Sequence, residues 1–149
     1  MPSAFSQPIF PVSNGSADPP AGTLGEYVSG SNTATSLTTG QWKSAASISL
    51  TAGEWDVQGV AVIKGTSTTS FTYVVVGIAT TLDGAVGFGG RFANVFAALV
   101  PGVSFFFEIV SPVTRIKINT TTTVYVNTYQ LFTVSTATSD GYIRARRVG

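Results

Sequence analysis

The sequence predicts an all-β protein, an antiparallel β-sandwich of the jelly-roll type that follows an extended N-terminal arm. The 149 residues are rich in β-branched, aromatic and turn-forming residues, with 21 threonines, 10 phenylalanines and 16 glycines, which strands and tight connections favour. Good helix formers such as Lys, Glu, Met and Gln are scarce. From Gly25 onward, Gly, Asn, Asp, Pro and Ser divide the chain into the short runs typical of sandwiches and barrels.

Residues 1–22 differ in composition from the rest and are predicted to form the arm, with the sandwich over residues 23–149. Five of the seven prolines fall in this segment, and proline is excluded from helix interiors and central strands. The alternative is a terminus without fixed structure, as many free termini are. The large apolar side chains of the arm are its candidate anchoring residues on a neighbouring molecule: Phe5, Ile9, Phe10 and Val12.

The first strand signals follow the arm. Residues 47–50 alternate strictly between polar and apolar side chains, and residues 51–54 supply turn chemistry. In the next strand, alternate residues from Trp55 to Ile63 share one face. We therefore predict a hairpin here.

Two later runs, residues 71–78 and 103–110, are apolar on both faces apart from Ser104 and Glu108. Each is predicted to be covered on two sides, by a second sheet or by another subunit. Residues 115–118 alternate, residues 122–134 form a long strand rich in Thr, Val and Tyr, and the chain ends in a further strand. Eight or nine strands in two sheets favour a jelly roll.

The side chains that enzymes use most are missing, so the protein is predicted to be non-enzymatic. The sequence has no histidine, no cysteine and only 15 charged residues, 8 basic and 7 acidic. General acid-base catalysis, cysteine or Ser-His nucleophiles and zinc sites each lack a member. No catalytic, cofactor-binding or metal-binding residues are therefore predicted.

The net charge of +1 gives no case for nucleic acid or an anionic membrane as partner. No apolar run approaches the roughly 20 residues of a membrane span, and no signal peptide is recognisable. We expect a soluble protein that is not exported by that route.

Two motifs could be mistaken for catalytic or ligand sites. Glu54 and Asp56 lie on one face of a strand, as glycosidase carboxylates can, but their position just after a turn indicates a solvent-facing strand start. The glycine-rich run of residues 84–90 lacks the Lys-Ser or Lys-Thr of a phosphate loop and is interpreted as a flexible connection or a strand with close backbone contacts.

Basic and aromatic clusters provide the remaining candidates. Arg144, Arg146 and Arg147 form the one basic cluster of the sequence. We predict that they pair with acidic residues of a neighbouring strand or subunit, as inter-subunit or edge-strand residues, the alternative being a grip on phosphate or acidic sugar. Among the aromatic residues, Trp42 is predicted to be exposed because Gln41 and Lys43 flank it, and exposed aromatic rings can stack on sugars.

A mean hydropathy of +0.32 is high for a single soluble domain of this size. Burial between copies explains the surplus apolar surface best, so a homo-oligomer is expected.

Two stretches resemble segments of small structural proteins of tailed bacteriophages. One runs from Leu37 to Trp42 and from Ser47 to Gly59, with Ala-Gly-Glu-Trp-Asp-Val at its centre. The other is Gly141 to Val148, with Ile-Arg-Ala-Arg-Arg, preceded by Val124–Val126 and Leu131-Phe132.

The resemblance implies a virion component with a jelly-roll-like body and no catalytic residues: a head decoration or cement protein, a head fibre or a tail-fibre module. The implied partners are further copies of the chain, with a trimer favoured and a dimer also open, and the major capsid protein or another virion protein. The implied location is the virion, assembled in the host cytoplasm. The competing interpretation is a carbohydrate-binding or tail-fibre module that recognises a host-surface glycan.

Overall fold

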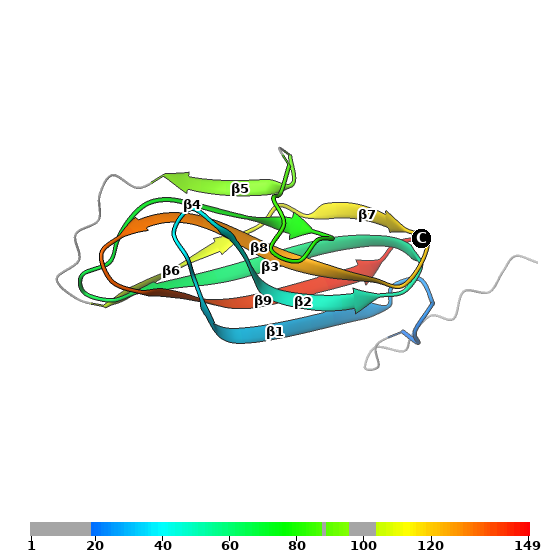
Figure 1. Cartoon of the computed structure of the whole chain (residues 1–149). Helices are drawn as coiled ribbons and strands as arrows, with labels where there is room; N and C mark the ends of the chain where they lie inside the picture. Colours follow the sequence, from blue (N-terminus) through cyan, green and yellow to red (C-terminus); the bar gives the residue numbers. More distant parts are fainter. Residues whose placement is uncertain (1–18, 88, 96–103) are drawn as a thin grey trace, which may run out of the picture.

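The computed structural model describes residues 19–87, 89–95 and 104–149. The prediction of an all-β antiparallel sandwich is confirmed, because the described part of the chain forms nine strands in two antiparallel sheets that lie face to face (Figure 1). The strands are β1 (Tyr27–Ser36), β2 (Trp42–Leu50), β3 (Gly53–Gly65), β4 (Ser70–Ala79), β5 (Arg91–Val95), β6 (Phe105–Val110), β7 (Thr114–Ile118), β8 (Thr122–Thr133) and β9 (Ala137–Arg147).

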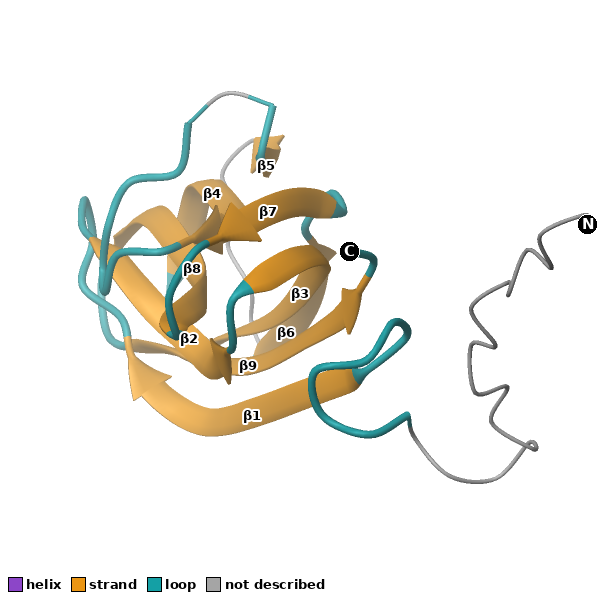
Figure 2. Cartoon of the chain, turned by 90° about the vertical axis from the view of Figure 1, so that its right-hand side faces the viewer, coloured by secondary structure: helices purple, strands orange, loops and turns teal. Residues whose placement is uncertain are grey.

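The strand order is that of a jelly roll. Sheet A has the order β1-β9-β3-β6, and β7 also pairs with β3; sheet B has the order β2-β8-β4-β5. Strands β6 and β7 pair with different stretches of β3 and together form one interrupted strand. The first strand then pairs with the last, the second with the last but one, and so on inward to β4 and β5, which is a double Greek key. Figure 2 shows the two layers end on.

The interruption between β6 and β7 contains Pro112, which has no N–H to donate to a sheet. At this break Ser111 forms two hydrogen bonds to Gly59 of β3. Its N–H donates to the carbonyl of Gly59 at 2.8 Å, and its hydroxyl accepts from the N–H of Gly59 at 2.9 Å. The backbone of β3 therefore stays hydrogen-bonded where its neighbour bends.

The core lies between the sheets and includes Trp55, which is fully buried and donates its ring N–H to the carbonyl of Thr51 at 2.9 Å. The face of β3 predicted to be apolar is confirmed as the inner face, because each of its residues is buried. Each large core side chain stabilises the fold by about 1.5–3 kcal/mol through burial. The largest are Trp55, Phe71, Leu50, Ile63, Ile109 and Ile143.

The predicted hairpin at residues 47–63 is wrong. Strand β2 pairs with β8 in sheet B, whereas β3 pairs with β9, β6 and β7 in sheet A. The turn is tight, but it carries the chain across the core from one sheet to the other. The physical reason is that both strands have strongly apolar inner faces, with Ile48 and Leu50 on one and Trp55 and Val57 on the other. These faces are buried by lying opposite each other rather than side by side.

Double coverage is confirmed for β4 but not for β6. Val75 of β4 is buried, and a side-chain atom at the neighbouring Gly77 would come within 2.5 Å of Val86, so the connection after β4 covers its outer side. On β6, by contrast, Phe106 and Val110 are 69% and 46% exposed. The outer side of β6 is therefore open in the single chain.

The predicted arm contacts Phe5, Ile9, Phe10 and Val12 lie outside the described residues, and their role stays a prediction. The described chain begins at one end of the sandwich, where the N–H of Gly25 donates to the carbonyl of Arg147 at 3.0 Å. Among the described residues, no helix is long and apolar enough to cross a membrane.

Candidate functional site

The outer face of sheet A carries the largest group of exposed apolar side chains that the described structure places on one sheet. Side chains alternate between the two faces of each strand, so every second residue of β1, β9, β3, β6 and β7 points outward. The exposed large apolar side chains on or beside this face are Tyr27, Tyr142, Phe106, Val110 and Val113. An apolar area of this kind is typical of a surface that binds another protein.

A row of apolar residues crosses the middle of this face. Val60 of β3 lies opposite Tyr142 of β9 on one side and opposite Val110 of β6 on the other. The hydroxyl groups of Tyr142 and Tyr27 are 2.8 Å apart and share a hydrogen bond, which raises the pKa of Tyr27. Both tyrosines are thereby held on the surface with their rings partly exposed.

Ion pairs border the apolar row. Arg115 of β7 donates to both carboxylate oxygens of Asp56, at 2.5 and 3.0 Å, and these bonds lower the pKa of Asp56. Lys64 binds Asp140, and Lys117 lies 3.3 Å from Glu54. Such exposed pairs contribute little to stability, typically below about 1 kcal/mol.

The prediction that Glu54 and Asp56 mark a solvent-facing strand start is confirmed, because each forms an ion pair with a basic residue of β7 on this outer face. Each of the two carboxylates is bound to a basic side chain rather than to another carboxylate. Among the described residues, no group of three or more Asp or Glu side chains could hold a metal ion.

Three charged residues on the same face have no ion-pair partner among the described residues. Arg144 donates to the neutral side chain of Gln58 at 2.5 Å, and Arg146 and the exposed Glu108 have no side-chain hydrogen bond in the described structure. Both arginines line a shallow hollow of about 380 Å³ together with Tyr27, Asp56, Gln58, Val113 and Ala145. The positive charge of Arg144 and Arg146 in this hollow has no carboxylate partner among the described residues.

The structure separates the three arginines that the sequence analysis grouped. Strand β9 lies between β1 and β3, so it is an internal strand and not an edge. Arg144 and Arg146 point outward, but Arg147 is only 7% exposed. The sequence contained the signal for this difference. Arg147 is two and four residues after Ala145 and Ile143, and residues at such spacing on a strand share one face, here the inward one.

Arg147 binds the end of the sandwich together. Its Nε donates to the buried carboxylate of Glu26 at 3.0 Å, and its other nitrogens donate to the carbonyl of Ala52 at 2.7 Å and to the hydroxyl of Thr51. The guanidinium also lies over the ring of Trp55, 4.4 Å from its centre. These contacts join the entry to β1, the β2–β3 turn and the end of β9, so Arg147 has a structural role within one subunit.

The outer face of sheet B carries a row of three aromatic rings. Trp42 of β2 packs against Tyr129 of β8 with ring centres 5.5 Å apart, and Tyr129 packs against Tyr73 of β4 at 6.3 Å. The rings are inclined to one another by 48° and 71° and do not form a common plane. Trp42 was predicted to be exposed; the structure places it half-buried, with Tyr129 against its ring.

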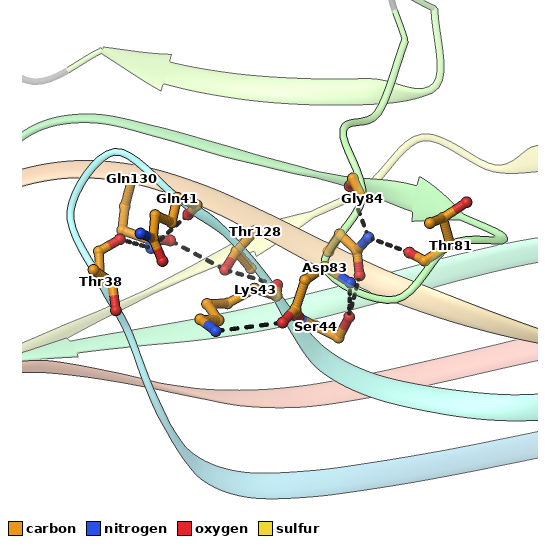
Figure 3. A network of polar contacts seen from close by, with 10 residues as sticks. Thr38, Gln41, Lys43, Ser44, Thr81, Asp83, Gly84, Thr128 and Gln130 are labelled. Atoms are coloured by element: carbon orange, nitrogen blue, oxygen red, sulfur yellow. Dashed lines mark hydrogen bonds and ion pairs between the residues drawn. The ribbon is translucent and has the colours of Figure 1, made fainter.

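A polar network holds the loops beside this row (Figure 3). The carboxylate of Asp83 accepts bonds from the N–H of Ser44 at 2.7 Å and from Lys43 at 3.3 Å. Burial alone would raise the pKa of Asp83, but the bonds from Ser44 and Lys43 outweigh burial and lower it. Asn127 donates to the carbonyls of Thr81 and Gly84, at 3.0 and 2.8 Å.

The second half of the network contains the fully buried Gln130, which donates to the carbonyls of Thr38 and Gln41 at 2.9 and 3.1 Å. The sequence analysis missed Asn127 and Gln130, because a polar residue in a Thr-rich strand gives no sign of burial. Their bonds position loops and leave no group free for catalysis. The described part of the run 84–90 is a connection held by Asn127, as predicted for that segment.

Comparison with known protein-family models gives no match, and comparison with curated proteins gives none either. Among solved structures, a chain described as "Structure of infectious bursal disease virus Gx strain" aligns with a TM-score of 0.43 and 12% sequence identity. The alignment covers 85% of this chain and 34% of that chain, so this chain spans about a third of the length of the viral one. Function must therefore be inferred from the two outer faces themselves.

Proposed function

We propose that this protein is a non-enzymatic structural component of a virion, and specifically an oligomeric decoration protein that binds and reinforces a tailed-bacteriophage capsid. The observation that carries the proposal is the outer face of sheet A, where five large apolar side chains are exposed between ion pairs. An apolar centre with a polar rim is the usual anatomy of a protein-binding surface.

The fold and the chemistry of the chain agree with this role. Jelly rolls are common in viral capsid domains and also in lectins, and a fold alone does not fix a function. The carboxylates that could serve in hydrolysis, Glu54 and Asp56, are engaged by Lys117 and Arg115. A binding role therefore fits the site better than a catalytic one.

Attachment to the particle is assigned to the N-terminal arm. The described chain enters β1 at one end of the sandwich, and the proline-rich composition of residues 1–22 favours an extended arm before it. Several arms in one oligomer would engage neighbouring capsid subunits together, and avidity would multiply weak contacts.

The test is co-sedimentation with undecorated phage heads. The full chain is expected to pellet with heads, and a variant lacking residues 2–20 is expected to keep its β-sheet circular dichroism spectrum while remaining in the supernatant. If the full chain stays in the supernatant, the decoration role is wrong. If the shortened chain still pellets, attachment by the arm is wrong.

A second candidate function is recognition of a host-surface glycan, which the row Trp42, Tyr129 and Tyr73 favours because aromatic rings stack on sugars. It ranks second because the inclined rings offer no flat platform. Binding on a glycan array that Trp42→Ala abolishes would support it.

A further inference from the structure

We infer that the outer face of sheet A binds the same face of a second copy across a two-fold axis that passes over Val60, with Glu108 of each copy against Arg144 of the other. The virion proposal does not assign this contact, and the inference holds or fails independently of that proposal.

The first argument for this contact is the register of sheet A. Across from Val60 lie Tyr142 and Val110, one on each neighbouring strand. Two residues further along β3, Val62 lies opposite Glu108 of β6; two residues back, Gln58 lies opposite Arg144 of β9. Glu108 and Arg144 are therefore placed symmetrically on either side of Val60.

The second argument is the set of charged residues on this face that have no ion-pair partner among the described residues. Exposed Glu108 has no ion-pair partner among the described residues, and Arg144 and Arg146 have no carboxylate partner there either, whereas Asp56, Asp140 and Glu54 are all paired. In a contact with two-fold symmetry, residue i meets residue j and residue j meets residue i. One such rotation brings Glu108 of each copy to Arg144 of the other copy. The face is therefore complementary in charge to itself.

The third argument is the apolar surface and the area of this face. Around Val60, between the two charged positions, lie Val62 and the partly exposed side chains of Tyr142 and Val110, and exposed Phe106 lies beyond Glu108; a second copy would cover them all. A sheet four strands wide and as long as β3 has a face of roughly 800 Å², from a strand spacing of about 4.8 Å and a rise of about 3.3 Å per residue. That is about the area that each partner contributes to a standard stable interface.

The hollow beside Arg144 gives the carboxylate a place to enter. Arg144, Arg146 and Tyr27 line it, and Asp56, which also lines it, is already bound to Arg115. A carboxylate there receives charge-assisted hydrogen bonds, which are roughly twice as strong as neutral ones.

The test is a charge exchange measured by sedimentation equilibrium on the full chain, whose single-copy mass is 15.4 kDa. The wild type is expected to have twice that mass. Glu108→Arg and Arg144→Glu each place like charges together at two symmetric points, and each is expected to weaken dimerisation roughly tenfold or more. The double variant restores both pairs in reversed order and is expected to recover the wild-type dissociation constant.

Lys43→Glu is the matched control, because it makes the same change of charge as Arg144→Glu on the other sheet. It is expected to leave dimerisation unchanged. A wild type that is a monomer, or a trimer as the sequence analysis favoured, overturns the inference. So does a dimer that neither single variant weakens, or one that the double variant fails to restore. Circular dichroism of each variant separates loss of the contact from loss of the fold.

Discussion

At the scale of single residues, Arg147 shows how one side chain can hold the end of a sandwich. It is buried with Glu26, and both charges are satisfied by hydrogen bonds within the chain. Arg144, three residues earlier, has the same chemistry but points to solvent. The two arginines differ because they point to opposite faces of the same strand, not because their chemistry differs.

Arg147→Met is expected to lower the free energy of unfolding by about 3–5 kcal/mol, because it leaves the buried carboxylate of Glu26 without its cation. Urea denaturation followed by tryptophan fluorescence measures this change, and Trp55 lies under the guanidinium. Lys117→Met, the control at an exposed ion pair, is expected to change stability by less than about 1 kcal/mol. Adding Glu26→Gln to Arg147→Met should recover part of the loss; equal stability of Arg147→Met and wild type would contradict the role of the pair.

At the scale of elements, the backbones of β9 and β2 approach each other closely at Gly141. A side-chain atom at this position would come within 2.4 Å of the backbone of Ala45, and one at Gly30 would come within 2.6 Å of the carbonyl of Ser47. Glycine is needed at both positions because β1 and β9 of sheet A press against β2 of sheet B at this corner of the sandwich.

Gly141→Ala is expected to destabilise the protein by about 1–3 kcal/mol, since backbone atoms must move to make room for the methyl group. Thermal unfolding followed by circular dichroism measures the effect. Gly87→Ala is the control, because nothing lies within 4 Å of the added atom there. A melting temperature unchanged in Gly141→Ala would show that the two strands are not in close contact.

The elements that sequence reasoning predicted best are those with a regular apolar face. The alternation from Trp55 to Ile63 identified β3 and its inner face, and the same pattern identified β9. Strand β1 was not predicted as a strand, because its Ser, Thr, Gly and Asn residues are mostly exposed and show no apolar period.

What sequence reasoning could not provide is strand pairing. Tyr27 lies opposite Arg146, more than a hundred residues away in the chain, and a local pattern contains no information on such a partner. The hairpin error at residues 47–63 has the same cause. For the candidate site, the sequence identified Arg144 and Arg146, but it could not show that Glu108 and Val60 share their face, because this depends on the pairing of β3 with β6 and β9.

At the scale of the whole molecule, carboxylates tie separate parts of the sandwich together. Asp56 joins β3 to β7, Asp83 joins the loop after β4 to β2, and Asp140 joins β9 to β3 and β1 through Lys64 and Ala34. Their hydrogen bonds to basic side chains or backbone N–H groups lower the pKa of each of the three carboxyl groups.

Stability is therefore expected to be constant from neutral pH down to the unfolded Asp pKa of about 3.9 and to fall as the pH drops further, through the lowered pKa values of the folded state. In this range the unfolded chain binds protons that the folded chain does not. Urea midpoints measured from pH 7 to pH 2 test the expectation. The triple variant Asp56→Asn, Asp83→Asn, Asp140→Asn should be less stable at pH 7, and its urea midpoint should fall less between pH 4 and pH 2 than that of the wild type. An equally large fall would assign the acid sensitivity to other groups.

The position of β9 has a consequence for biosynthesis. It follows every other strand in the chain, yet it lies between β1 and β3. On the ribosome, β1 and β3 emerge long before the strand that joins them. Both present open edges during that interval, and β3 also presents an uncovered apolar face. Open strand edges recruit other chains, and partly folded species of this kind aggregate. High-level expression of the protein should therefore depend on chaperones or on slow translation, even though the finished sandwich has its central strand firmly in place.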